Sequence, residues 1–416
     1  MTAHAIEAPK SRLGAFSHLP FAVMWVATTC SLTGVAISDT TSAWLMTNLN
    51  ADPRAVTMVQ AASSLSMFLF TIPAGALADM VAPRRYLLIL ESVITALITI
   101  FGFMVLFDRV NEATLILATF TLSAFWSVAA PAWLSITPLL VPARDLDSAN
   151  AFNSVGYNIS RAIGPVLAGA ALTVLGAAAP YLIFAGADLM SVAALLWWRP
   201  PTHAATGRST ENLLRCTLTG IRHAAENKDL KATMVRVIAV YPFACAYTAL
   251  LPLIARSQID MGPEFYGILL AIASVGAVFS SFLLGFLRAR FSPDVVVALG
   301  TIGISAGLIL FALARGPVLA VSAAFVAGAA WTIVLVGLYT SALISLPEAV
   351  RARGLGIFLT VIFGCVTAGS VAWGQIAAYA GQPSALFAAA LGVLLMIPLT
   401  WGAKLKSVQT PDISDD

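Results

Sequence analysis

The chain has 416 residues, of which 59% are hydrophobic and 10% are charged, with a formal net charge of +3 and a mean hydropathy of +0.89. This balance excludes a water-soluble globular fold, because only a lipid environment accepts so much apolar surface. The four cysteines and four histidines share no disulfide or metal-ligand spacing, so neither a metal centre nor a cofactor is expected.

Twelve apolar stretches follow one another along the chain, and each approaches or exceeds the roughly 20 residues that a spanning helix needs. They cover residues 20–48, 54–79, 86–107, 112–141, 147–175, 178–199, 231–257, 264–288, 294–314, 317–346, 350–378 and 384–403. The sequence therefore predicts an all-α membrane protein with twelve transmembrane helices.

The basic residues predict its orientation. If both termini are cytoplasmic, most of the 23 Lys and Arg residues lie in cytoplasmic segments, and only Arg54, Arg109, Arg256 and Arg315 lie outside. Because short cytoplasmic loops are enriched in Lys and Arg, this bias favours an even number of spans. We expect a multi-pass protein of a bacterial inner membrane with both termini in the cytoplasm.

Charged residues within the predicted spans are few. Asp39 in the first span and Asp188 in the sixth each lie about eight residues from the outer end, or roughly 12 Å below the outer surface. Arg161, near the middle of the fifth span, is long enough to reach that level. The three are predicted to form one cluster for proton or ion coupling, with Asp39 as the leading carboxylate and Asp188 as the structural partner of Arg161.

The turn between the second and third spans reads GALADMVAPRR at 75–85. Gly75 allows two helices to touch, and Asp79 can accept hydrogen bonds from Arg84 or Arg85. We interpret these residues as a latch that holds the cytoplasmic side shut when the outer side is open. The alternative for the two arginines is that they only anchor the chain on the cytoplasmic side.

Glu91 follows that arginine pair by about two helical turns. A salt bridge with one of the arginines is expected near the cytoplasmic end, which would make Glu91 part of the latch.

Polar and aromatic side chains predict a substrate cavity. Ser42 shares a helix face with Asp39, and Asn153 and Tyr157 share one with Arg161. Aromatic groups on spans that line or flank the cavity suit a bulky amphipathic ligand, although packing is the alternative for each of them. The predicted aromatic lining includes Trp126, Tyr241, Tyr247, Trp331 and Tyr339.

Gly164 and Pro165 interrupt the polar face of the fifth span. Since Pro lacks a backbone donor and Gly allows close approach, they fit either a hinge or a tight-packing joint.

The longest polar stretch separates six spans from six. It divides the chain into an N-terminal bundle at 1–199, a linker at 200–230 and a C-terminal bundle at 231–416. The linker is predicted to hold an amphipathic interfacial helix, with a solvated loop as the alternative.

The two halves also repeat one another. A shift of 205 residues aligns Phe120 with Phe325, Trp126 with Trp331, Pro142 with Pro347, Gly164 with Gly369, and Gly169 with Gly374. Two six-span repeats with a substrate site between them are typical of alternating-access transporters.

These motifs resemble the major facilitator superfamily. GALADMVAPRR is similar to its signature between the second and third spans, and NISRAIGPVLAG at 158–169 is similar to the Gly-Pro signature of its antiporters. More narrowly, TSAWLMTNL, VQAASSL, PAW and SANAFNSVGYNISRAIGP resemble the branch of bacterial secretion carriers that includes the enterobactin exporter. The resemblance implies a twelve-helix fold that exports organic compounds against protons.

The sequence thus predicts an antiporter rather than an enzyme. It would export a bulky drug-like or siderophore-like compound in exchange for protons, as a monomer in the bilayer and with no nucleic-acid partner. A proton-coupled uptake symporter or a facilitative carrier on the same fold is the nearest alternative. A membrane enzyme lacks the expected nucleophile and metal motifs, and a transport-inactive sensor would not need the latch.

Overall fold

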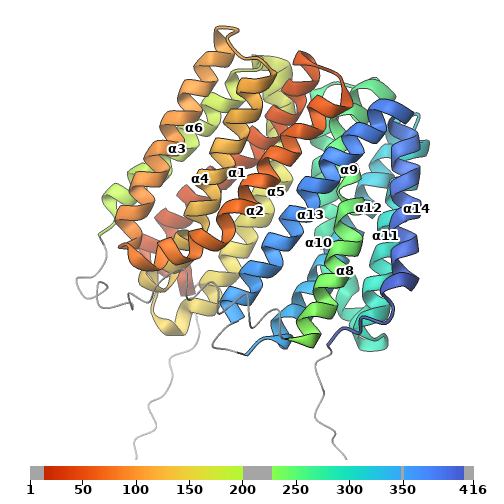
Figure 1. Cartoon of the computed structure of the whole chain (residues 1–416). Coiled ribbons are helices and arrows are strands. Elements are labelled where there is room, and N and C mark those ends of the chain that lie inside the picture. The colour runs from red at the N-terminus through yellow and green to blue at the C-terminus, as the bar shows by residue number, and fades with distance from the viewer. Residues whose placement is uncertain (1–13, 200–226, 348–350, 407–416) are drawn as a thin grey trace, which may run out of the picture.

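The computed structural model describes residues 14–199, 227–347 and 351–406, and within these ranges it contains helices and no strands. Twelve of the helical segments are long and apolar enough to cross a membrane, which confirms the predicted fold class. Figure 1 shows them running roughly side by side, with the described chain beginning and ending at the same face. Most of the predicted linker, including the amphipathic helix, lies outside the described residues.

The first six spans are single helices. They are α1 (Leu19–Leu49), α2 (Pro53–Met80), α3 (Pro83–Leu106), α4 (Glu112–Leu140), α5 (Leu146–Leu175) and α6 (Ala179–Trp197). Short 3₁₀ turns at Gly14–Ser17 and Ala143–Asp145 precede α1 and α5.

The second six spans contain one interrupted helix. The seventh span consists of α8 (Lys228–Ala244), α9 (Ala246–Leu253) and a π-helical turn at Ile254–Gln258. The others are α10 (Pro263–Arg290), α11 (Pro293–Leu313), α12 (Pro317–Ser345), α13 (Arg351–Ala380) and α14 (Gln382–Thr400).

Proline and capping residues explain where the spans begin. Eight of the spans carry a Pro in their first turn. Backbone N–H groups in the first turn have no hydrogen-bond acceptor within the helix, so a Pro there removes no helical hydrogen bond. Asp52 caps α2 by accepting from the backbone N–H of Arg54 at 2.8 Å, and Asn111 forms a capping box with Thr114 at the start of α4. Within each half, the connections between spans are short.

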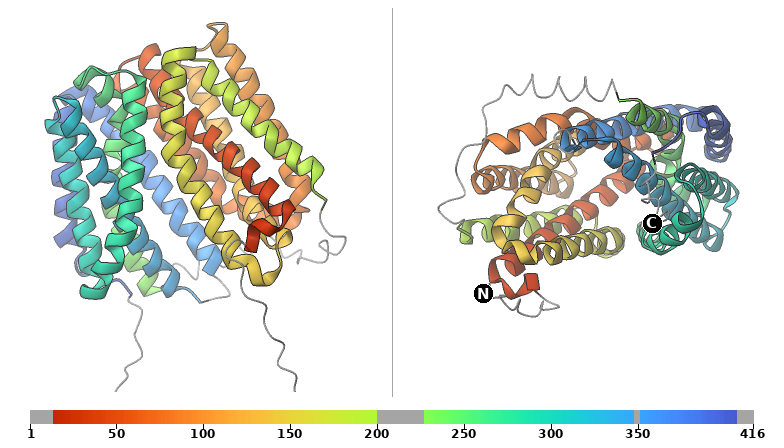
Figure 2. Two further views of the ribbon diagram at one scale, coloured as in Figure 1. Left: turned by 180° about the vertical axis from the view of Figure 1, so that it is seen from behind. Right: turned by 90° about the horizontal axis from the view of Figure 1, so that it is seen from below.

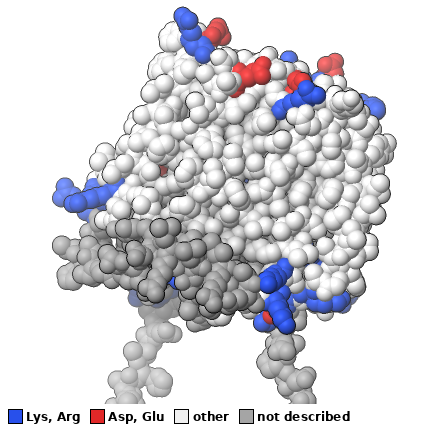
Figure 3. Space-filling view, in the orientation of Figure 1, with Lys and Arg blue, Asp and Glu red and all other residues white. Residues whose placement is uncertain are grey.

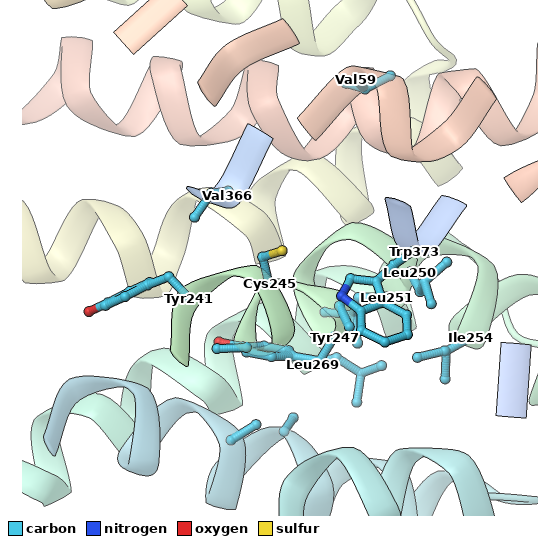
Figure 4. Packing of buried hydrophobic residues seen from close by; sticks show 14 of the residues in the cluster. Val59, Tyr241, Cys245, Tyr247, Leu250, Leu251, Ile254, Leu269, Val366 and Trp373 are labelled. Atoms are coloured by element: carbon cyan, nitrogen blue, oxygen red, sulfur yellow. The ribbon is translucent and has the colours of Figure 1, made fainter. Parts of the chain in front are cut away.

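The interruption of the seventh span is packed against α13. Pro242 lies just before the break at Cys245, and its carbonyl oxygen accepts a hydrogen bond from the indole N–H of Trp373 at 2.7 Å. Gly369 of α13 lies directly against Pro242 and Cys245. Figure 4 shows Cys245 and Trp373 within the same buried cluster as Tyr241 and Tyr247. The break is thus held by close packing rather than left open.

Equivalent helices of the two halves make equivalent contacts. The hydroxyl of Ser66 in α2 donates to the carbonyl of Phe120 at 2.6 Å, and Gly276 of α10 lies against the carbonyl of Phe325. These pairs follow the repeat seen in the sequence. The two sets of six helices meet mainly through α2 against α13 and α5 against α10 (Figures 1 and 2).

The surface fits a bilayer. On the face shown in Figure 3, charged groups gather at the two ends and the broad middle is uncharged. Large apolar side chains point outward along the spans, including Leu134 at 76%, Phe282 at 77% and Leu399 at 73% exposure. In water such exposure would be costly, whereas lipid accepts it.

Candidate functional site

The seam between α5 and α10 is tightly closed over its outer half, the half farther from the face where the described chain begins and ends. A Cβ atom on Gly169 would lie 2.6 Å from the carbonyl oxygen of Pro263, and Gly267 lies against the carbonyl of Pro165. The hydroxyl of Thr173 also donates to the carboxylate of Glu264 at 2.8 Å. Only glycine permits backbones to approach this closely.

The seam between α2 and α13 is closed over the same half. Gly374 lies against Thr57 and the carbonyl of Pro53, and near the middle of the seam a Cβ on Gly364 would lie 2.9 Å from the ring of Phe68. The outer end of the bundle is therefore sealed along both seams.

Arg256 strengthens this outer closure between α1 and the π-helical turn. Its guanidinium donates to the hydroxyl of Thr47 at 2.8 Å and to the side-chain oxygen of Asn48, and it lies 6.0 Å from the ring centre of Trp44. Trp44 in turn stacks on Tyr266 of α10, with ring centres 6.0 Å apart. Sequence reasoning missed this group, because it treated Arg256 only as a residue of an outer loop.

Three glycines in the inner halves of these helices have free space around them. Gly75 of α2, Gly285 of α10 and Gly356 of α13 have no atom within 4 Å of a Cβ position, in contrast to the outer glycines of these helices. Among the described residues, the tight glycine contacts between the two halves thus lie toward the outer end, and the end where the described chain begins and ends is the more open of the two. Gly75 makes no close helix contact in this conformation, and the side chain of Asp79 lies outside the described atoms.

Asp39 lies within α1 with an exposed carboxylate. Among the residues that the structure describes, no hydrogen bond or ion pair reaches it. Tyr181 and Tyr266 lie within electrostatic range. Ser42 shares Tyr181 as a neighbour, but Ser42 is buried and hydrogen-bonded to the hydroxyl of Tyr181 at 3.0 Å, on the side of α1 that faces α6.

Arg161 of α5 is also exposed. Its guanidinium donates to the hydroxyl of Tyr157 at 3.4 Å and lies 5.8 Å from that ring's centre, and Tyr247 of the other half lies nearby. The hydroxyl of Ser274 donates to its backbone carbonyl at 3.1 Å. No ion pair in the described ranges includes Arg161.

The alignment of α1 against α5 gives the relative depth of Asp39 and Arg161 in the bundle. Hydrogen bonds from Trp25 to Phe152 and from Thr33 to Ser160 both join residues 127 apart. Asp39 therefore lies about five residues farther outward than Arg161, or about 7.5 Å along the helix axis.

Asp188 is not part of this pair, so the predicted three-residue cluster is wrong. Its carboxylate is fully buried and accepts from Ser31 at 2.8 Å and from Thr95 at 2.7 Å. Because α6 runs beside α1, Asp188 is level with Ser31, about 12 Å inward of Asp39. The prediction counted residues from the outer ends of the two helices and took those ends to be level. In the structure α6 begins near the level of Ser42, whereas α1 continues outward to Leu49.

Glu91 pairs with Asp188, and the predicted salt bridge with the arginine pair is also wrong. Glu91 is 2% exposed, accepts from the indole N–H of Trp133 at 2.6 Å, and its carboxyl group interacts with that of Asp188. Arg84 instead donates to the carbonyls of Leu195 and Leu196 at 2.8 and 3.0 Å. The last carbonyls of α6 lack helical partners, which makes them good acceptors for a cation.

Arg85 is exposed, and no ion pair to it occurs in the described part of the chain. Gly164 is buried: a Cβ there would lie 2.6 Å from the Cβ of Ala36 and 3.1 Å from the carbonyl of Thr33. The helix α5 continues without a break through Pro165. Of the two interpretations of Gly164 and Pro165, the geometry favours a tight-packing joint.

The aromatic residues fall into two groups. Tyr241 and Tyr247 are buried and meet Trp331 edge to face, with ring centres 5.1 and 6.0 Å apart, and their hydroxyl groups point to the same side in Figure 4. Among the described residues, the hydroxyl of Tyr241 has no hydrogen-bond partner. Tyr339 is 37% exposed and packs against Phe358, whose ring centre is 6.0 Å away.

Two further residues of the predicted lining lie in the first half. Trp126 is half-buried, and the side-chain amide of Asn153 donates to the hydroxyl of Thr137 at 3.2 Å. In the described ranges, no cluster of His, Cys, Asp and Glu has the geometry to hold a metal ion.

The chain has twelve spans in two repeated sets, and the two sets meet along seams that are sealed at one end and more open at the other. Exposed charged residues lie within the spans. Together these features define the architecture of a secondary transporter. Comparison with known families places the chain within this class. It belongs to the transmembrane secretion effector family of the major facilitator superfamily, whose family model matches residues 10–415.

Individual relatives agree with this assignment. The chain is 25% identical over 372 residues to the multidrug efflux pump Tap of Mycolicibacterium fortuitum, covering 85% of this chain and 88% of that protein. Among solved structures, a POT family transporter superposes with a TM-score of 0.75 at 11% identity, covering 92% of this chain and 95% of that one. A bacterial homologue of the lysosomal transporter Spinster, inward-facing and unoccupied, gives 0.72 at 14% identity, with coverage of 92% and 97%. These similarities to solved structures show the fold.

Proposed function

We propose that this protein exports a bulky drug-like or siderophore-like compound across a bacterial inner membrane by proton antiport. The name of its relative Tap supports efflux of drugs. The bundles at 1–199 and 231–416 rock about the linker, with both termini cytoplasmic, and a monomer suffices. In this assignment the open end of the described bundle faces the cytoplasm, where the protein takes up its substrate.

The observation that carries the proposal is Asp39, an exposed carboxylate within a span that has no partner in the described ranges. A carboxylate in this position can hold either a proton or a cationic substrate, but not both. Exchange of the two across the cycle couples export to proton entry, and the bound species biases which end of the bundle is open.

The cytoplasmic latch completes the cycle. In the outward-open state, Asp79, Arg84 and Arg85 hold the inner ends of α2 and α3 against the second half, and Gly75 then makes the close helix contact that it lacks here. Arg84 and Glu91 keep the first half rigid during this movement through their contacts with α6 and α4.

The first test is the substitution Asp39→Asn in proteoliposomes. We expect substrate-driven proton movement to fall at least about tenfold, because an amide of the same shape binds no proton at neutral pH. Asp108→Asn is the matched control, since Asp108 is exposed in the loop after α3 at a φ of 53°, which Asn tolerates. Unchanged proton movement in Asp39→Asn would contradict the proposal.

Direction is tested in cells with a labelled substrate and an uncoupler. Collapse of the proton gradient increases accumulation if the protein exports its substrate, and decreases it if the protein is an uptake symporter.

A further inference from the structure

Asp39 and Arg161 are opposite charges on neighbouring helices that do not neutralise each other. Both are exposed, and the register of α1 against α5 separates them by about 7.5 Å along the axis. Within the described ranges neither belongs to an ion pair. Water can solvate both while the inner end is open, but it must leave when the bundles close around a bound molecule.

The two charges differ in how they can be compensated once water has left. An uncompensated charge at this depth costs several kcal/mol. Asp39 can be neutralised by a proton or by a cation. Arg161 cannot lose its proton in a protein, so only an anionic group can compensate it. A purely cationic molecule would leave Arg161 uncompensated, and a purely anionic one would have no group to displace the proton from Asp39.

Aromatic side chains surround both charges. The guanidinium of Arg161 lies beside the ring of Tyr157 and near Tyr247, which meets Trp331 edge to face. Tyr266 of α10 lies within electrostatic range of Asp39. Tyr247 and Tyr266 are buried, whereas Tyr157 is 45% exposed and Trp331 is partly exposed. A flat ring system between the two charges would therefore contact Tyr157 from the first half and Trp331 from the second.

We infer that the transported compound is an amphoteric aromatic molecule whose anionic group contacts Arg161 and whose amine contacts Asp39. Its two charged groups are held apart by a rigid ring system, because the two residues are offset along the helix axis. The description of this molecule as cargo rests on the proposed export function, whereas its binding does not.

Three probes that share one scaffold test the inference by binding to the purified full-length protein. They are an arylpiperazine carboxylic acid, its methyl ester and its N-acetyl derivative, and binding is followed by tryptophan fluorescence, with Trp331 in the proposed site. The acid, which carries both charges, is expected to bind at least about tenfold more tightly than either derivative. Equal affinity for all three probes overturns the inference.

Two variants then assign each charge. Arg161→Gln is expected to abolish the preference for the acid over the ester and to keep the preference for the free amine over the N-acetyl form. Asp39→Asn is expected to abolish the preference for the free amine over the N-acetyl form and to keep the preference for the acid over the ester. The controls are Arg315→Gln and Asp108→Asn, both exposed in loops, which keep the wild-type order. Thermal denaturation of each variant shows whether it is folded. Folded variants that keep both preferences overturn the inference.

The binding test and the transport test fail separately. If the acid binds selectively but Asp39→Asn leaves proton movement unchanged, the proposed coupling is wrong and the assignment of the charges stands. If proton-coupled export is confirmed with a compound that lacks an anionic group and binds as tightly to Arg161→Gln as to the wild type, the inference is wrong and the export function stands.

Discussion

Glu91 and Asp188 place two carboxyl groups side by side within the first six helices. They receive hydrogen bonds from Trp133, Ser31 and Thr95, and no cation in the described ranges pairs with either. Two negative charges in neighbouring buried carboxyl groups would repel each other, so this arrangement favours at most one charge, with a proton shared by the pair. Four helices, α1, α3, α4 and α6, are joined through this one group.

The pair makes a prediction about single substitutions. Glu91→Gln is expected to be nearly neutral for stability, because an amide can accept from Trp133 and donate to Asp188 as a protonated Glu does. Asp188→Leu leaves the hydroxyl of Ser31 without its acceptor and should lower the free energy of unfolding by about 1–3 kcal/mol. Thermal denaturation in detergent measures both. Equal losses in the two variants would show that no shared proton exists.

Sequence reasoning identified Asp39, Asp188, Arg161 and Glu91 as informative, because ionisable side chains are rare in the spans. It could not predict their partners. A partner depends on helix rotation and on how far each helix projects beyond its neighbours, and the stagger of α1 against α6 alone moves Asp188 about 12 Å from Asp39. Hydropathy contains neither quantity.

The contacts between paired helices determine which end of the bundle is open. Along α5 and α10, and again along α2 and α13, glycines lie in contact with the opposite helix in the outer half, whereas Gly75, Gly285 and Gly356 farther inward have open space. Tight and open stretches of one seam lie on the same rigid helices, so a rocking movement that opens one end closes the other.

A substitution in one seam should therefore affect the other. Gly267→Ala places a Cβ against the carbonyl of Pro165 and is expected to open the outer end. Thr57 lies in the opposite seam and is 1% exposed. In a protein whose native cysteines are replaced, we predict that a cysteine introduced by Thr57→Cys reacts several-fold faster with an impermeant maleimide when Gly267→Ala is also present. The control is Gly186→Ala, which has no atom within 4 Å of the added Cβ. Unchanged reactivity in a folded protein would show that the seams move independently.

The break in the seventh span was not foreseen from the sequence, although Pro242 and Pro252 were visible there. Pro within a helix permits a break but does not require one, as the unbroken α5 shows at Pro165. What differs is the neighbour: Trp373 binds the carbonyl of Pro242.

For the whole molecule, the twelve spans and their duplication could be predicted because both depend on long, repeated patterns. Hydropathy fixes the number of crossings, and the bias of basic residues predicts their direction. The open or closed state could not be predicted, because one sequence must support both states with similar free energies.

Orientation gives a prediction for the intact protein. If the proposed orientation is correct, a fluorescent protein fused after Lys406 should stay in the cytoplasm, fold and fluoresce, and alkaline phosphatase inserted in the turn between α1 and α2 should be active outside. Expression in a bacterial host and measurement of both reporters in cells provide the test. Active phosphatase at the C-terminal fusion would reverse the assignment.

The outer seams repeat a single contact: Gly169 meets Pro263 in one, and Gly374 meets Pro53 in the other. If one ancestral bundle had paired with a second copy of itself about a two-fold axis, both contacts would have formed at once, as an isologous interface requires. One glycine in that ancestor would have made the contact in both seams of the dimer, and gene fusion would later have allowed each copy to diverge. The asymmetric placement of Asp39 and Arg161 in the first half alone is the kind of specialisation that a symmetric homodimer could not have maintained.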